Sequence, residues 1–187
     1  MFVNHNGTFI AGNPNFNNLI AVIGSRAATP YGVRIATDLG ENLAKHYTVC
    51  SGLAFGIDAA AHRGALTTGR TIGFLSSTDI YPAAHKFLAQ AMIEKDGSGL
   101  VAWNDGPPSR EKFLQRNVKL AEACQAVVVV EASMRSGSMH CAREFHDRGK
   151  PIFAVPGALT SLQSQGSNFL IKEGIARMVT EPSDITF

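Results

Sequence analysis

The stretch LIAVIGSRAATPYGVRIATDLGENL, residues 19–43, decides the fold class of this chain. It opens with an apolar run whose length and composition are typical of a strand buried on both faces of a parallel sheet. After a turn of small residues, a helix is predicted from Pro30, because Thr29 can cap it and proline is tolerated at the first helical position. Apolar positions at helical spacing predict its buried face: Val33, Ala36, Leu39 and Leu43.

The same alternation of strand and helix continues along the chain. Short apolar runs predict further strands at residues 47–50, 71–75, 100–103, 126–130 and 152–155. Amphipathic segments predict helices at residues 56–68, 83–95, 110–124, 136–148 and 163–174. This order predicts an α/β fold: a Rossmann-like, doubly wound, mostly parallel sheet with helices on both faces. We expect residues 19–187 to form one such domain and residues 1–18 an N-terminal arm or edge strand.

Composition limits the classes of function. With 187 residues, 45% of them hydrophobic, the chain can bury one good core. Its formal net charge of +2 is too small to indicate a nucleic-acid binder, so any basic footprint must be local. The cysteines Cys50, Cys124 and Cys141 form no CxxC pair, which argues against a disulfide framework or a metal site and favours a reducing compartment.

The amino-terminal residues do not resemble a targeting segment. They lack the basic region and the continuous apolar run of a secretory signal. No apolar run in the chain approaches the ~20 residues that a membrane helix needs. We therefore expect a soluble, cytoplasmic protein with no membrane partner.

Ligands of open parallel sheets bind at the carboxyl ends of the strands, so the loops after the predicted strands are candidate sites. The first, Gly24-Ser25-Arg26, places a hydroxyl and a guanidinium beside a helix N-terminus, an arrangement that suits an anion. The alternative is a glycine needed for the turn and an arginine paired with a carboxylate.

A later loop, EASMRSGS at residues 131–138, opens the next helix with hydroxyls and an arginine. These groups again form an anion cradle at a helix N-terminus. Glu131 is either a catalytic carboxylate or, as is commoner, the partner that holds Arg135 or Arg26 in place.

The loop SGLAFGID, residues 51–58, contains glycines that let backbone N–H groups face a ligand closely. The GxGxxG pattern is absent and no Walker lysine follows, which disfavours NAD and ATP folds of the usual kind. Asp58 and His62 lie four residues apart on one helix face. They are either an acid–base pair or, as we expect from their spacing, a pair that stabilises its own helix.

The segment REKFLQRNVK, residues 110–119, is locally basic, with four cations against one anion. Phe113 and Arg116 are three residues apart and therefore neighbours on a helix. Cations for phosphates beside a flat ring for a base suit a single-stranded nucleic acid. The alternative is a solvated helix face with one core phenylalanine.

Six motifs resemble those of the DNA-processing protein A (DprA/Smf) family, in the family's order and spacing. They are GSR at residues 24–26, SGLAFGIDAAAHRGAL at 51–66, YPAAH at 81–85, FLQRN at 113–117, RSGS at 135–138 and PG…QGSNFLI at 156–171. Each motif alone is weak, but the set is highly specific and covers roughly residues 8–176.

The resemblance implies an extended Rossmann-like fold, a homodimer, and binding of single-stranded DNA without marked sequence preference. It also implies protection of that DNA and loading of a RecA-type recombinase in recombination or natural transformation, with no catalytic step and no cofactor. Arg26 resembles the family's principal phosphate-binding arginine, while Phe113 and Arg116 fall in its FPxRNR-like element. The candidate DNA- or phosphate-binding residues are Gly24, Ser25, Arg26, Ser51, Gly52, Phe113, Arg116, Asn117, Arg135, Ser136, Gly137 and Ser138.

The chain departs from the family pattern in two ways. Leu114 replaces the usual proline and Val118 the second arginine of the FPxRNR-like element, with only Lys119 near enough to compensate, so a lower DNA affinity is expected. The chain also shows neither the helical N-terminal extension nor the C-terminal winged helix of many relatives. We expect either a minimal member of the family or a shortened chain.

Two other functions compete with this interpretation. Lysine-decarboxylase-like phosphoribohydrolases have a similar fold and would use Glu131 or Asp58 as the catalytic carboxylate, but their PGGxGTxxE loop is missing here. The other is a nucleotide-sensing module that binds a small phosphate ligand around Arg26 and Arg135. Competition between a mononucleotide and an oligonucleotide would separate this module from a DNA binder.

Overall fold

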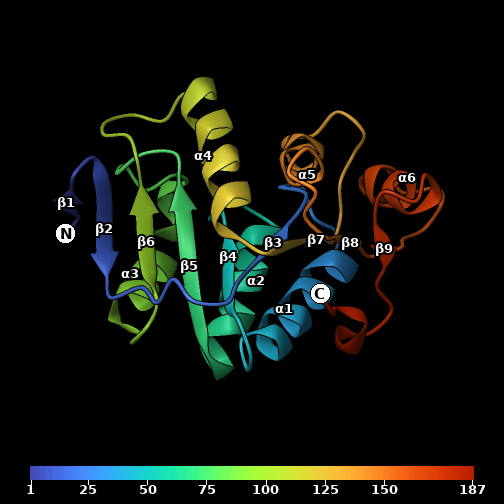
Figure 1. Ribbon diagram of the computed structural model, residues 1–187, viewed down its shortest axis with the longest axis horizontal. Coiled ribbons are helices and arrows are strands. Elements are labelled where there is room, and N and C mark those ends of the chain that lie inside the picture. The colour runs from blue at the N-terminus through green and yellow to red at the C-terminus, as the bar shows by residue number, and fades with distance from the viewer.

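A computed structural model describes residues 1–187 and contains one nine-stranded sheet, in the order β1-β2-β6-β5-β4-β3-β7-β8-β9 (Figure 1). The strands are β1 (Val3–His5), β2 (Thr8–Gly12), β3 (Leu19–Ile23), β4 (Thr48–Ser51), β5 (Arg70–Leu75), β6 (Gly99–Ala102), β7 (Ala126–Val129), β8 (Ile152–Ala154) and β9 (Arg177–Met178). Strands β3 to β9 are mutually parallel, whereas β1 and β2 form an antiparallel hairpin on β6. The predicted α/β class is confirmed.

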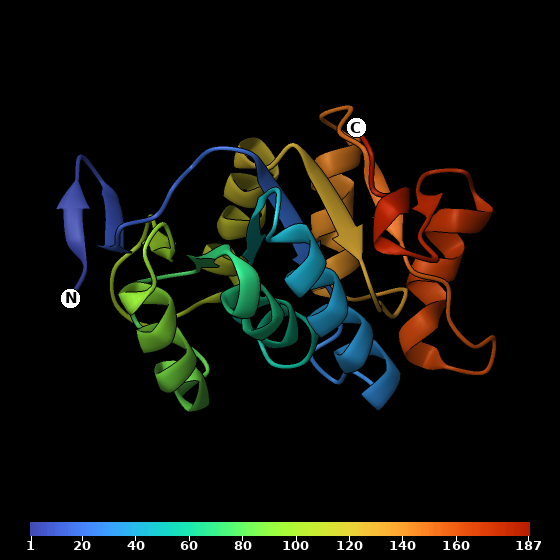
Figure 2. The same ribbon diagram turned by 90° about the horizontal axis from the view of Figure 1, so that it is seen from below.

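Helices cover both faces of the sheet (Figure 2). They are α1 (Pro30–Leu43), α2 (Ile57–Thr68), α3 (Lys86–Glu94), α4 (Arg110–Ala123), α5 (Gly137–His146) and α6 (Gln165–Lys172), with short 3-10 turns η1 (Ala83–His85), η2 (Leu162–Ser164) and η3 (Pro182–Asp184). Helices α1, α2 and α3 pack on one face, and α4, α5 and α6 on the other. No helix has the length and apolar character needed to cross a bilayer.

The central strand β3 shows why a continuous apolar run folds as it does. Its alternate residues Leu19, Ala21 and Ile23 join the core under α4 and α5, whereas Ile20 and Val22 join the core under α1 and α2. Because side chains of a strand alternate between its faces, burial on both sides requires apolar residues throughout.

Helix α1 begins as its sequence predicts and buries Ala36, Leu39 and Leu43 as expected, but not Val33. The side chain of Thr29 accepts a hydrogen bond from the backbone N–H of Gly32 at 3.1 Å, and so caps the helix. Val33, predicted to be buried, is 39% exposed. The reason is that α1 meets α2 through Gly40, where an added Cβ would lie 2.3 Å from the carbonyl oxygen of Ala61. Small residues, not only large apolar ones, set the contact face.

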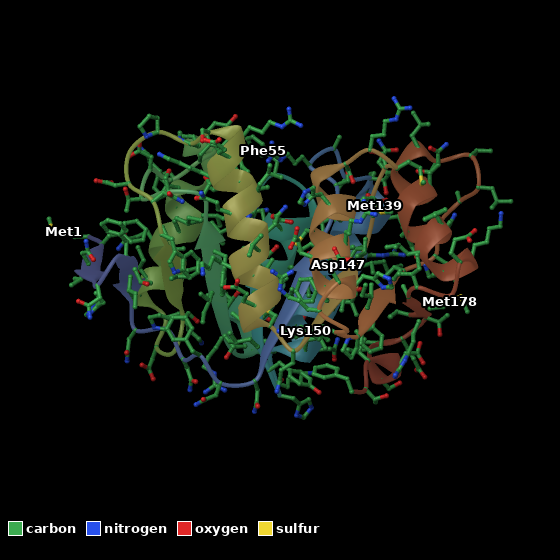
Figure 3. All side chains as sticks on the ribbon, turned by 45° about the horizontal axis from the view of Figure 1, so that its top comes forward. Met1, Phe55, Met139, Asp147, Lys150 and Met178 are labelled. Atoms are coloured by element: carbon green, nitrogen blue, oxygen red, sulfur yellow. The ribbon has the colours of Figure 1, made fainter.

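The ends of the sheet differ from its centre. Figure 3 places Met1, beside the β1–β2 hairpin, and Met178, in β9, at opposite ends of the molecule. Strand β9 was not predicted, because it has only two residues and both are exposed. The helix predicted at residues 83–95 is divided between η1 and α3.

The strand order reverses at β3, and this reversal positions the site. The chain winds outward from β3 through β4, β5 and β6, and then returns to place β7 and β8 on the other side of β3. The loops after β3 and β7 therefore diverge at the carboxyl edge of the sheet, which is the upper edge in Figure 1. Crevices at such reversal points are the usual ligand sites of doubly wound sheets.

Candidate functional site

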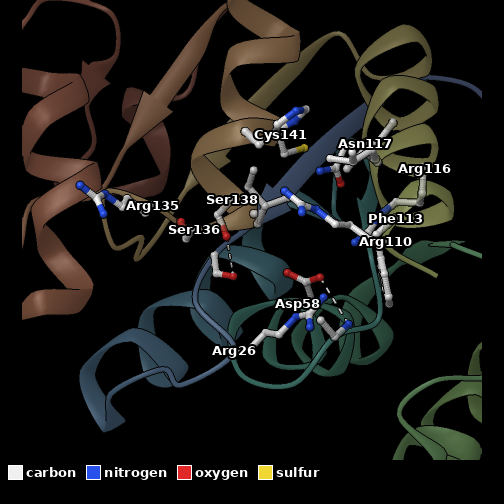
Figure 4. A pocket seen from close by; sticks show the side chains of 17 residues that line it. Arg26, Asp58, Arg110, Phe113, Arg116, Asn117, Arg135, Ser136, Ser138 and Cys141 are labelled. Atoms are coloured by element: carbon white, nitrogen blue, oxygen red, sulfur yellow. Dashed lines mark hydrogen bonds between the residues drawn. The ribbon is translucent and has the colours of Figure 1, made fainter. Parts of the chain in front are cut away.

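A cavity of about 680 Å³ lies at this reversal point, between α4, α5 and the start of α2 (Figure 4). Its wall is formed by residues of four segments: Ile23, Gly24, Arg26, Ala54, Asp58, Arg110, Phe113, Leu114, Arg116, Asn117, Leu120, Arg135, Ser136, Gly137, Ser138, His140 and Cys141. The structure thus brings nine of the twelve predicted site residues together. The other three, Ser25, Ser51 and Gly52, do not line it.

The cavity wall is strongly basic. Four guanidinium groups line it, from Arg26, Arg110, Arg116 and Arg135, against the single carboxylate of Asp58. None of these arginines has a carboxylate within ion-pair distance. Because unpaired guanidinium groups are planar donors that match phosphate oxygens, the cavity is suited to an anion.

The loop after β3 depends on glycine and presents Arg26. A Cβ on Gly24 would lie 2.6 Å from the Cγ1 of Ile57, so no larger residue fits between β3 and α2. The hydroxyl oxygen of Ser25 accepts a hydrogen bond from the backbone N–H of Ala27 at 3.2 Å, and therefore shapes the turn. Arg26 is left exposed on this turn, with its side chain directed over the cavity (Figure 4).

The ring of Phe113 is held by cations and not by the core. The guanidinium carbons of Arg26 and Arg116 lie 5.1 and 6.0 Å from its centroid, both within cation–π range. Tyr81 meets it edge-on at 6.3 Å. Phe113 is half-buried and belongs to none of the three hydrophobic core clusters.

Arg116 is the most enclosed of the cavity cations, with 8% of its surface exposed. Its Nη1 donates to the carbonyl oxygen of Phe74 at 3.3 Å, and its buried Nε has no acceptor. A Cβ on Gly52 would lie 1.3 Å from Nη1. Gly52 thus provides the space in which the guanidinium lies, a role that the sequence did not show.

Asp58 shapes the loop between β4 and α2. Its Oδ2 accepts hydrogen bonds from the backbone N–H groups of Gly52 and Ala54 at 3.2 and 3.3 Å. The Gly52 N–H that was predicted to face a ligand is therefore already bonded. The neighbouring Ser51 is completely buried.

His62 does not pair with Asp58, so the expected helix-stabilising pair is absent. Instead, His62 Nδ1 lies 2.6 Å from the hydroxyl of Thr71 on β5. Complete burial, reinforced by the charges of His85 and Arg116, lowers the pKa of His62 to about 3. His62 is therefore a neutral core residue.

Glu131 was expected to hold Arg135 or Arg26, and this expectation is wrong. Its carboxylate accepts hydrogen bonds from the backbone N–H and the hydroxyl of Thr29, at 2.9 and 2.5 Å. It is 2% exposed and packs against Gly32, where a Cβ would lie 2.4 Å from Oε2. Glu131 thus fixes the start of α1, because sheet order places the end of β7 beside the loop after β3.

The start of α5 forms the opposite wall. Ser136 caps the helix, its hydroxyl oxygen accepting from the backbone N–H of Met139 at 3.3 Å. Ser138 donates from its hydroxyl to the carbonyl oxygen of Gly24 at 2.8 Å and so ties α5 to the loop after β3. Arg135 remains exposed beside this helix N-terminus, whose partial positive charge also favours anions.

Sequence reasoning missed several wall residues, among them Arg110 and His140. Arg110 lay in the basic segment, and His140 follows Ser136 by one helical turn, so helical spacing was the available signal. Cys141 is also in the wall, but burial raises the pKa of its thiol to about 12. No group of histidine, cysteine and carboxylate side chains is arranged to hold a metal ion.

Fold and cavity together define a doubly wound, Rossmann-like α/β protein with an arginine-lined cavity at its strand reversal. Residues 7–187 match the model of the family described as DNA recombination-mediator protein A. The chain belongs to this family, as its motifs indicated.

Individual relatives agree with this assignment. A protein named "Putative DNA processing protein DprA" of Mycobacterium tuberculosis is 42% identical over 173 residues, which are 88% of this chain and 43% of that protein. The crystal structure of DNA processing protein A from Streptococcus pneumoniae superposes with a TM-score of 0.86 at 33% identity, covering 95% of this chain and 64% of the other. A structure of DNA processing protein A from Helicobacter pylori is described by its single-stranded DNA binding mode. It superposes with a TM-score of 0.85 at 26% identity and covers 98% of this chain and 92% of the other. The chain spans about half the length of the curated relatives it matches.

Proposed function

We propose that this chain binds single-stranded DNA in the arginine-lined cavity, with phosphates at Arg26 and Arg135 and a base against the ring of Phe113. The observation that carries the proposal is the position of a half-buried aromatic ring beside two guanidinium groups that have no carboxylate partner. Stacking surfaces beside cations are the common elements of proteins that bind single strands without sequence preference. A duplex hides its base faces and would lose the stacking contribution.

The biological role that fits this binding is that of a recombination mediator. The family model carries that description, and the Helicobacter pylori relative is described as binding single-stranded DNA. We infer that the chain acts in the cytoplasm as a homodimer, protects single strands and delivers them to a RecA-type recombinase in recombination or natural transformation. We also infer that residues 19–187 act as one domain, with residues 1–18 as an edge appendage.

The proposal includes no catalytic step. A phosphoribohydrolase would use Glu131 or Asp58 as its carboxylate. Both accept hydrogen bonds from backbone N–H groups, Glu131 from Thr29 and Asp58 from Gly52 and Ala54. Glu131 is also enclosed by Thr29 and Gly32, away from the cavity. A general base must reach the reacting proton: Glu131 does not line the cavity, and Asp58 lines it with Oδ2 engaged by two backbone N–H groups.

A mononucleotide is the alternative ligand, because a volume of about 680 Å³ also falls in the range of small-molecule pockets. Competition separates the two possibilities. Anisotropy of a labelled oligothymidylate should rise on titration with the protein, and millimolar AMP should displace it only weakly. Displacement by AMP at micromolar concentration would make the chain a nucleotide sensor.

The direct test compares a single strand with a duplex of equal length. We expect tighter binding of the single strand and a fall in log affinity with log salt of ~0.7 per phosphate neutralised. Equal affinity for both forms would contradict the proposed stacking on Phe113. An affinity independent of salt would contradict the proposed contacts between arginines and phosphates.

A further inference from the structure

A second cavity lies on the other flank of α4. It has a volume of about 300 Å³ and is placed at the carboxyl ends of β5 and β6. Its wall includes Trp103, Asn104, Gln115 and Lys119, and it shares Arg116 with the larger cavity. No carboxylate lines it.

Trp103, the only tryptophan of the chain, forms a flat platform in this cavity. Its ring packs on Phe74 with the centroids 5.6 Å apart, so one side is supported by the core. The ammonium nitrogen of Lys119 lies 6.0 Å from the ring centroid and 3.0 Å from the carboxylate of Glu122, an exposed ion pair that a phosphate can replace at little cost. Trp103 is half-buried, so that part of the ring remains accessible. A rigid indole beside a lysine combines the two groups that a nucleotide needs, a stacking surface and a phosphate contact.

Two polar side chains in the wall of this cavity have unused hydrogen-bonding capacity. The Nδ2 of Asn104 donates to the Oε1 of Gln115 at 3.2 Å and to the carbonyl oxygen of Ser76 at 3.3 Å. The Oδ1 of Asn104 and the Nε2 of Gln115 make no hydrogen bond. One free acceptor and one free donor can therefore meet a base edge.

The two cavities are adjacent along α4. Leu114 lines the larger cavity and Gln115 the smaller one, and both side chains are exposed on the outer surface of the helix. A strand that crosses this part of α4 would meet Phe113 on one side and Trp103 on the other. Arg116, which reaches both walls, lies beneath the crossing.

We propose that the Trp103 cavity is a second base-binding subsite for the same single strand, occupied by a nucleotide that has crossed α4 from the Phe113 cavity. The inference rests on the proposed function, because it assigns a continuation of that strand. It predicts a step in affinity at the oligonucleotide length that first reaches Trp103. Stacking on aromatic rings predicts a gain of about fivefold or more at that step.

Oligothymidylates of increasing length test the subsite in the full chain. Short oligomers should bind in a manner that depends on Arg26 and leave the fluorescence of Trp103 unchanged. Longer oligomers should quench the fluorescence of Trp103 and bind more tightly than short ones. The gain should be lost in Lys119→Gln and Trp103→Leu, and kept in Lys45→Gln, which removes a charge from the far end of α1.

Photocrosslinking of the wild-type protein keeps the test valid if Trp103→Leu does not fold, since Trp103 supports Phe74. Iodouracil at successive positions of one oligomer should crosslink to two tryptic peptides, residues 113–116 and 96–110, which carry Phe113 and Trp103 separately. Tight, Arg26-dependent binding without quenching at any length and without crosslinks to residues 96–110 would overturn the subsite and leave the proposed function intact. Absence of binding to any single strand would overturn both.

Discussion

The guanidinium carbon of Arg26 lies 5.1 Å from the ring centroid of Phe113, although the two residues are 87 positions apart in the sequence and belong to different elements at the carboxyl edge of the sheet. Arg26 follows β3, and Phe113 lies in the first turn of α4. The ring and the cation thus form one surface on which a phosphate and a base of the same nucleotide can be bound together. This pair is the centre of the proposed interface.

Arg26→Ala should weaken binding of single-stranded DNA by roughly 10- to 150-fold, since charge-assisted hydrogen bonds contribute about 1.5–3 kcal/mol. Arg26→Lys should recover only part, because an ammonium lacks the planar pair of donors. Anisotropy titration measures both. Arg63→Ala, which removes an exposed arginine from α2, is the matched control and should bind like wild type. A folded Arg26→Ala protein with unchanged affinity would place the site elsewhere.

Phe113→Ala should cost roughly 1–3 kcal/mol of DNA affinity if a base stacks on the ring, whereas a fully buried phenylalanine would cost ~3–5 kcal/mol of folding stability. Phe113→Trp should retain binding, because another flat ring serves the same purpose. A urea melt paired with a titration separates the two effects. Phe87→Ala, which removes a ring that is 90% exposed on α3, controls for surface substitution. Large destabilisation with unchanged affinity would assign Phe113 to the core.

Gly52→Ala should reduce DNA affinity by about tenfold while the protein still folds. The added Cβ would collide with the Arg116 guanidinium, which is the far end of a flexible side chain and can move away. The move breaks the hydrogen bond to Phe74, at a cost of about 1–2 kcal/mol in unfolding free energy. Parallel denaturation and binding measurements check the prediction. Wild-type affinity in Gly52→Ala would show that the position of Arg116 is unimportant for binding.

Stability should fall on acidification because of His62. Its pKa is about 3 in the folded chain and about 6.5 when unfolded, so the unfolded state binds more protons between these values. Its contribution is therefore complete above pH 6.5 and declines as the pH falls, by about 2 kcal/mol between pH 7 and pH 5. His62→Gln should remove this dependence, whereas replacement of the exposed His5 should not. Urea unfolding at pH 7 and pH 5 measures the change in unfolding free energy. An equal change for wild type and His62→Gln would refute the assignment.

No ribose phosphate should be released from AMP by this protein, and neither NAD nor DNA should be hydrolysed. The physical reason is that Glu131 is committed to Thr29 at the start of α1. Product analysis over a range of protein concentrations provides the measurement. Release that scales with protein and disappears in Glu131→Gln would favour the phosphoribohydrolase function instead.

The sequence by itself determined the fold class and the segments that surround the site. Local patterns are sufficient for this. The five apolar residues 19–23, bounded by polar and small residues, have the length of a buried strand, and Thr29-Pro30 can start a helix without help from the rest of the chain. Ligands of doubly wound sheets bind at the carboxyl ends of the strands, and this rule identified the loops of Arg26 and Arg135 as candidate sites.

Only the tertiary structure decided what each of those side chains contacts. Glu131 binds Thr29 because β7 lies beside β3 in the sheet, and the sequence pattern does not predict that strand order. Gly52 was predicted to bind a ligand and instead makes room for Arg116. Hydrogen bonds and close packing act over a few ångströms between segments that are remote in sequence, so partners appear only once the strands are in register. Chain-local preferences specify the elements, and their packing specifies the site.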